Sequence, residues 1–133
     1  MIKKKKVGML TLGCKVNQYE SEAISEALDK LGIAAVSPDR DCDAYIVNTC
    51  TVTAEADRKS RQMIRRLHAA NPIAPIIVTG CTAQSSPQKT AEMDGVCAVC
   101  GNAEKLRCAS LAAELIANER RKETSIYVPD IQN

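Results

Sequence analysis

Three of the seven cysteines follow closely on short aliphatic segments that are typical of buried β-strands. They are Cys14, Cys50 and Cys81, and each lies two residues beyond the predicted end of its strand. The carboxyl ends of parallel strands share one edge of an open sheet, and ligands bind in the crevice beyond that edge. Cysteines 36 and 31 positions apart can therefore become neighbours in space. Three thiolates at one edge favour a metal or iron–sulfur site.

The number of thiols limits which kinds of metal site are possible. A closed structural zinc site takes four protein ligands, whereas three leave one coordination position open. Three thiolates suit a catalytic zinc or a cubane iron–sulfur cluster with one exposed iron. Gly13 and Gly80 precede two of the cysteines, where a glycine lets the backbone turn sharply and approach an inorganic group. Against this interpretation, buried free cysteines are common and inert, and no CxxC motif joins these three.

The other four cysteines are weaker candidates. Cys97 and Cys100 form a CxxC motif, which is a redox pair or half of a zinc site in other proteins. This motif lies in an apolar, strand-like segment rather than at a helix start, so a structural role is favoured. Cys42 and Cys108 are interpreted as incidental. A small thiol oxidoreductase that uses Cys97 and Cys100 remains an alternative.

Composition limits the class of protein. The 133 residues are about one domain, with 45% hydrophobic and 26% charged residues, as in ordinary globular proteins. The net charge of +2 is too small for the whole chain to attract nucleic acid. No apolar run approaches the ~20 residues of a membrane span. We expect no targeting segment, no membrane anchor and a cytoplasmic location, and the odd cysteine count fits no disulfide framework.

The elements that must position the cysteines alternate between strand and helix. This alternation predicts an α/β fold, with a doubly wound, mostly parallel sheet of about five strands and helices on both faces. Residues 1–123 are predicted to form the domain, and 124–133 to be extended and to start a linker. The strands are expected at 7–12, 33–36, 44–48, 75–79 and 96–99, and the helices at 18–31, 53–70, 103–119 and in a short turn from Ser86 and Pro87.

The predicted helices also indicate where several side chains lie. Asn17 and Glu20 resemble a capping box at the start of the first helix, and Tyr19 and Leu31 fall on its apolar stripe. His68 is expected on the surface of the second helix. The exposed side of that helix carries Arg58, Arg61 and Arg65, which are either a solvated face or contacts for phosphates.

The motifs around the cysteines together resemble a known family. That family is the N-terminal domain of the methylthiotransferases, radical S-adenosylmethionine enzymes that add a methylthio group to tRNA or to a ribosomal protein. The details around Cys14 and Cys50 look most like the branch that acts on N6-threonylcarbamoyladenosine in tRNA. The matching segments are 11–22 (TLGCKVNQYESE), 47–53 (VNTCTVT), 56–61 (ADRKSR), 78–84 (VTGCTAQ) and 101–105 (GNAEK).

The resemblance implies that Cys14, Cys50 and Cys81 bind an auxiliary [4Fe-4S] cluster whose open iron serves sulfur delivery. In the family, a second [4Fe-4S] cluster and S-adenosylmethionine belong to a radical domain, which is followed by a C-terminal RNA-binding domain. The resemblance implies that the radical domain forms a carbon radical on the adenine of tRNA, and that a second S-adenosylmethionine supplies the methyl group. This chain carries neither further domain, so we expect the fragment alone to be inactive. A zinc- or iron-binding interaction domain without catalysis is the competing hypothesis.

Overall fold

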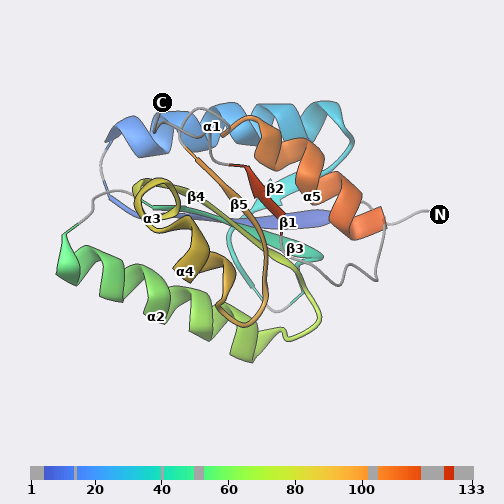
Figure 1. Ribbon diagram of the computed structural model, residues 1–133. Helices are drawn as coiled ribbons and strands as arrows, with labels where there is room; N and C mark the ends of the chain where they lie inside the picture. The colour runs from blue at the N-terminus through green and yellow to red at the C-terminus, as the bar shows by residue number, and fades with distance from the viewer. Residues whose placement is uncertain are drawn as a thin grey trace.

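The computed structural model describes residues 5–13, 15–39, 41–49, 53–101, 105–117 and 125–127 (Figure 1). Within these ranges one sheet contains six strands, and every neighbouring pair is parallel, in the order β2-β1-β3-β4-β5-β6. The strands are β1 (Lys6–Thr11), β2 (Ala34–Val36), β3 (Ala44–Thr49), β4 (Ile76–Gly80), β5 (Val96–Cys100) and β6 (Ser125–Tyr127).

Helices cover both faces of this sheet. The helices α1 (Lys15–Lys30) and α5 (Arg107–Ala117) lie along one face, and α2 (Ala54–Ala70) and α4 (Pro87–Ala91) lie along the other; α3 is Cys81–Ser85 (Figure 1). The prediction of a doubly wound α/β fold is confirmed. In the described part of the chain, no helix is long and apolar enough to cross a membrane.

Two hydrophobic clusters hold the layers together, one on each face. Ile46 of β3 packs with Leu28 of α1 and Leu111 of α5, whereas its neighbour Val47 packs on the other face with Ile64 of α2. Four of these side chains are fully buried: Ile46, Val47, Leu28 and Ile64. Continuous apolar segments are what a parallel sheet covered on both faces requires.

The second helix agrees with its prediction at both ends. Thr53 is the N-cap of α2, and its hydroxyl accepts a hydrogen bond from the backbone N–H of Ala56 at 3.1 Å. At the other end, Asn71 is the C-cap and its N–H donates to the carbonyl of Leu67. Side-chain capping of the first orphan N–H groups is the reason that such a residue starts a helix.

The first helix differs from its prediction. It begins at Lys15, so Asn17 lies inside its first turn and is not its cap. Tyr19 and Leu31 are exposed, at 78% and 51%, while Asn17 and Ser21 are buried. The N-terminal half of α1 lies over the polar ends of the strands, where the Ser21 hydroxyl meets the hydroxyl of Thr11 at 2.6 Å. Leu31 follows the last residue of the helix.

Two further differences concern the C-terminal part. The last helix is predicted from residue 103, but residues 105 and 106 form a turn and α5 is described over Arg107–Ala117. Its predicted cap Asn102 and its predicted end at 118–119 lie outside the described residues. Ser125–Tyr127 falls in the segment predicted to start a linker, yet it pairs with β5 as a parallel strand. The sheet therefore continues past residue 123, and the domain boundary itself stays a prediction.

Candidate metal centre at the carboxyl edge of the sheet

Three neighbouring strands end together at the edge where the predicted cysteines follow. β1 and β3 are adjacent and pair Thr11 with Asn48, while β3 and β4 pair Thr49 with Gly80. Cys81 is the first residue of α3 and is partly exposed. Cys14 and Cys50 lie outside the described residues, so the three-cysteine site stays a prediction.

The turn before Cys81 is crowded by the neighbouring strand. Gly80 has φ 100° and ψ −161°, a combination that is essentially restricted to glycine. A Cβ there would collide with the carbonyl oxygen of Thr49 and come within 2.6 Å of its hydroxyl. Gly13, before Cys14, also has a positive φ of 104°. The sharp turns are therefore confirmed, but the close contact at Gly80 is with Thr49 of the protein itself.

The Thr49 side chain connects its strand to both sides of Cys81. Its hydroxyl donates to the carbonyl of Thr79 at 2.9 Å and accepts from the backbone N–H of Thr82 at 3.0 Å. Thr49 is fully buried. A satisfied buried hydroxyl fixes its partners more strongly than an exposed one, because no water competes for them.

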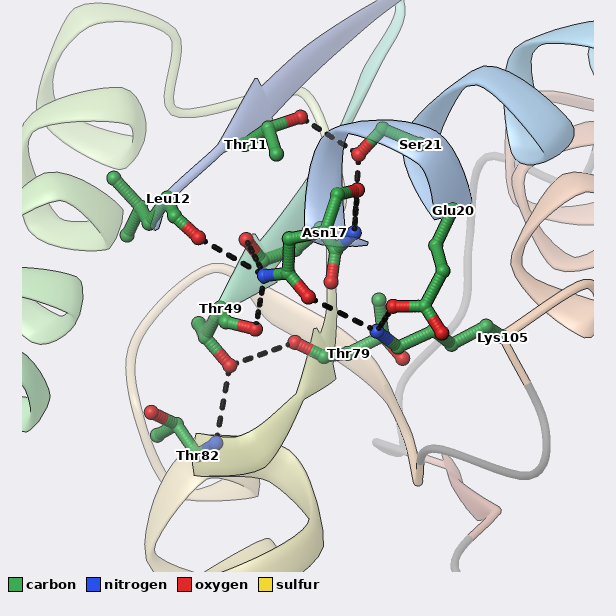
Figure 2. Close-up of polar contacts among 10 residues, drawn as sticks. Thr11, Leu12, Asn17, Glu20, Ser21, Thr49, Thr79, Thr82 and Lys105 are labelled. Atoms are coloured by element: carbon green, nitrogen blue, oxygen red, sulfur yellow. Dashed lines mark hydrogen bonds and ion pairs between the residues drawn. The ribbon is translucent and has the colours of Figure 1, made fainter. Parts of the chain in front are cut away.

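Asn17 connects the ends of β1 and β3 (Figure 2). Its side-chain NH₂ donates to the carbonyl of Leu12 at 2.9 Å and to that of Thr49 at 2.5 Å. The amide oxygen accepts from the ammonium of Lys105 at 3.3 Å, and Lys105 also forms an ion pair with Glu20. Asn17 and Glu20 are thus members of a tertiary network and not of the predicted capping box.

Sequence reasoning missed this network, although one signal was present. Asn17 and Ser21 continue the spacing of the buried residues Ile24 and Leu28 along α1. Polar residues at buried positions need hydrogen-bond partners, so their place on this stripe indicates a polar neighbour. Lys105 carries no comparable signal, because its burial depends on how α1 and the residues before α5 meet.

One buried hydroxyl next to Cys81 in the sequence is able to donate a hydrogen bond to a sulfur ligand. The hydroxyl of Thr82 is buried and has no hydrogen-bond partner among the described residues. The side-chain oxygen of Asn48 also lacks a partner there, but it is an acceptor and does not favour an anion. A free hydroxyl beside Cys81 can donate to a thiolate or sulfide, and such hydrogen bonds tune iron–sulfur centres. Of the three predicted ligands, only Cys81 lies among the described residues, and this thiol with its neighbour Thr82 fits a place in a three-thiolate cluster. In the described ranges alone, no three His, Cys, Asp or Glu residues gather closely enough to hold a metal ion.

The remaining cysteines have the surroundings of structural thiols. Cys100 and Cys108 are fully buried, and a hydrogen bond with Cys100, together with burial, raises the pKa of the Cys108 thiol well above its usual range. The thiol of Cys97 donates to the carbonyl of Gly95 at 3.6 Å. Burial also raises the pKa of Cys42. Cys100 is fully buried in the same hydrophobic cluster as Cys108, which argues against the oxidoreductase hypothesis for the CxxC motif.

The surface of α2 differs in part from its prediction. His68 is only partly exposed, and its Nδ1 is buried so close to Gly95 that a Cβ there would come within 2.5 Å of it. The prediction of a surface histidine is confirmed only in part, because the turn before β5 packs against this end of α2 and covers Nδ1. Arg61 is paired with Asp57 at 2.9 Å, whereas Arg58 and Arg65 are exposed.

Comparison with known proteins gives one family and several relatives. The family described as "Uncharacterized protein family UPF0004" matches residues 6–101. The chain is 46% identical over 99 residues to the Threonylcarbamoyladenosine tRNA methylthiotransferase MtaB of Bacillus subtilis (strain 168), covering 74% of this chain and 22% of that protein. It is 36% identical over 126 residues to the protein of the same name from Aquifex aeolicus (strain VF5), covering 95% and 30%.

A relative with another printed name is more distant. The chain is 32% identical over 118 residues to the tRNA-2-methylthio-N(6)-dimethylallyladenosine synthase of Novosphingobium aromaticivorans, covering 87% of this chain and 27% of that protein. The chain therefore spans less than a third of the length of each of these three relatives.

Proposed function

The chain belongs to the UPF0004 family, and we propose that it is the auxiliary-cluster domain of a tRNA methylthiotransferase. The observation that carries the proposal is the adjacency of β1, β3 and β4, whose carboxyl ends precede Cys14, Cys50 and Cys81. The names of the relatives support the reaction, since all three describe enzymes that make methylthio-modified tRNA.

The proposed substrate is N6-threonylcarbamoyladenosine in tRNA, converted to its 2-methylthio derivative. The identities of 46% and 36% belong to relatives named for threonylcarbamoyladenosine, against 32% for the relative named for dimethylallyladenosine. A radical domain with its own [4Fe-4S] cluster, S-adenosylmethionine and an RNA-binding domain would come from the rest of a longer protein. The higher identity to the relatives named for threonylcarbamoyladenosine supports the branch that the motifs around Cys14 and Cys50 indicate.

The contribution of this chain is to hold the thiolates and leave one coordination position open. When bound, a [4Fe-4S] cluster would supply an iron at which sulfur is carried for transfer. Cys14, Cys50 and Cys81 would ligate three irons. The turn at Gly80 directs the chain out of the sheet toward Cys81, and the hydroxyl of Thr82, the next residue, has no hydrogen-bond partner in the described part of the chain.

The first test is the content of iron and acid-labile sulfide after anaerobic reconstitution of the 133-residue chain. We expect about four irons and four sulfides per chain in the wild type. Cys81→Ala should lose most of this iron, because two thiolates hold a cubane poorly. Cys97→Ala, which removes a thiol in β5, is the matched control and should load normally. Zinc in place of iron would favour the interaction-domain hypothesis, and equal iron in both variants would contradict the site.

The reaction is tested in the full-length enzyme with the same pair of variants. Cys81→Ala should abolish the methylthiolated nucleoside in tRNA digests while reductive cleavage of S-adenosylmethionine continues. Cys97→Ala should keep both activities. Retention of methylthiolated product by Cys81→Ala would refute the assignment of this cysteine.

A further inference from the structure

The amide of Asn17 lies where two of the three predicted ligand segments leave the sheet. Its NH₂ group bonds the carbonyl of Leu12, two residues before Cys14, and that of Thr49, directly before Cys50. The side chain is 6% exposed, so water does not replace these bonds. One side chain therefore fixes the spacing between two strand ends.

The orientation of this amide is set by Lys105. An ammonium group can only donate hydrogen bonds, so it requires the amide oxygen of Asn17 as its acceptor. The NH₂ group then faces the carbonyl oxygens, which can only accept (Figure 2). Lys105 is itself 7% exposed and is neutralised by its ion pair with Glu20. The Lys105 ammonium and the Asn17 NH₂ group can therefore act only as donors, and their partners only as acceptors. These bonds allow one orientation of the Asn17 amide.

The third ligand segment is attached to the same network through Thr49. The backbone of Thr49 accepts from Asn17, and its hydroxyl bonds Thr79 and Thr82 on either side of Cys81. A continuous chain of buried hydrogen bonds thus links the segments of Cys14, Cys50 and Cys81.

We propose that Asn17 is a positioning residue that, through Thr49, sets the relative places of the three ligand segments before any metal binds. This inference rests on the proposed function, because it assigns Asn17 to the same thiolate site. Asn17 itself ligates nothing. Changing outer residues that orient metal ligands typically costs about 10- to 100-fold in metal affinity.

A purely structural role is the competing explanation, and the chain contains a matched control for it. Asn71 is also partly buried, and its NH₂ donates to the carbonyl of Cys42 at 2.9 Å and to the hydroxyl of Tyr45 at 3.2 Å. Asn71 and Cys42 are 29 residues apart, and Asn17 and Thr49 are 32 residues apart, so both amides bridge distant segments. The Asn71 bridge lies at the opposite edge of the sheet.

The test compares Asn17→Asp with Asn71→Asp in metal-free, reduced protein. Each substitution keeps the shape of the side chain but replaces its NH₂ donor by a carboxylate oxygen. This oxygen then faces the oxygen atoms that accepted the hydrogen bonds of the NH₂ group. Two readouts are taken: titration with Cd²⁺, followed by thiolate-to-metal charge-transfer absorbance, and bridging of Cys50 to Cys81 by dibromobimane, mapped by peptide mass spectrometry. Circular dichroism checks the fold of each variant, and a variant without Cys14, Cys50 and Cys81 supplies the background.

We expect Asn17→Asp to stay folded, to lose about 10- to 100-fold in Cd²⁺ affinity and to bridge less, while Asn71→Asp matches the wild type. Thr49→Val should behave like Asn17→Asp, and Thr49→Ser should restore binding because it keeps the hydroxyl. Equal Cd²⁺ affinity and bridging in Asn17→Asp and the wild type would overturn the inference. Unfolding of both Asn17→Asp and Thr49→Val, with Asn71→Asp folded, would also overturn it, in favour of a structural role.

These readouts are separate from the test of the proposed function. If the wild type binds Cd²⁺ in a manner that depends on Asn17 but never assembles iron and sulfide, the positioning role stands and the cluster assignment fails. If iron and sulfide assemble equally well in Asn17→Asp and Cd²⁺ affinity is unchanged, the cluster assignment stands and the positioning role fails.

Discussion

At the scale of single residues, the site depends on positions that allow only one residue type. Gly80 must combine a positive φ with close contact to Thr49, and Asn17 must offer a donor and an acceptor in opposite directions. The need for glycine was visible in the sequence from its place before Cys81. The need for an amide was not visible in the sequence, because Asn17 with Glu20 three residues later matches the local pattern of a helix cap equally well.

Gly80→Ala tests this residue scale. We expect it to lower the free energy of unfolding by about 3 kcal/mol or more, because backbone strain alone is worth about 1–3 kcal/mol and the Cβ also collides with Thr49. Gly32→Ala is the control: Gly32 has φ 79° but nothing within 4 Å of a Cβ, so only the strain of about 1–2 kcal/mol applies. Urea unfolding measures both, and equal losses would contradict the contact with Thr49.

At the scale of the elements, α1 carries two functions along its length. Its C-terminal half buries Ile24 and Leu28 in the hydrophobic cluster, whereas its N-terminal half buries Asn17 and Ser21 against strand ends. Helical spacing predicted the buried face correctly in the middle of the helix. It failed for Tyr19, which lies on the side of α1 opposite to Asn17 and Ser21, and for Leu31, which follows the last residue of the helix.

Leu28 in α1 and Leu31, directly after the end of this helix, test the division. Leu28→Ala should cost about 2–5 kcal/mol of unfolding free energy, because its fully buried side chain leaves a cavity between α1 and the sheet. Leu31→Ala should change stability by about 0.5 kcal/mol or less, since this side chain is half exposed. Chemical denaturation of the two variants decides the matter, and similar losses would mean that Leu31 is buried in solution.

At the scale of the whole molecule, the order β2-β1-β3-β4-β5-β6 places β1, β3 and β4 side by side near the middle of the sheet. Their carboxyl ends therefore share one edge, with layers of helices on both faces (Figure 1). The last strand, β6, extends the sheet past residue 123, and it protects the backbone groups of β5 that would otherwise be an open edge.

Truncation after residue 123 tests the contribution of β6. The shortened chain should lose about 1–3 kcal/mol of unfolding free energy, because a few backbone hydrogen bonds to β5 disappear, each worth about 1 kcal/mol net. Equilibrium unfolding of the 123- and 133-residue forms measures this difference. Identical stability would support the predicted boundary and would mean that Ser125–Tyr127 adds nothing to the domain.

The sequence by itself determined the alternation of strands and helices, the parallel sheet and the side of the sheet on which Cys81 follows. These properties depend on periodicity and on turn residues within short windows, which a linear reading captures. Only the tertiary structure decided that Asn17 bonds Thr49, 32 residues away, that Lys105 reaches Asn17 across 88 residues, and that His68 packs under Gly95. Long-range hydrogen bonds between buried side chains leave no periodic pattern, because each depends on where two distant segments meet.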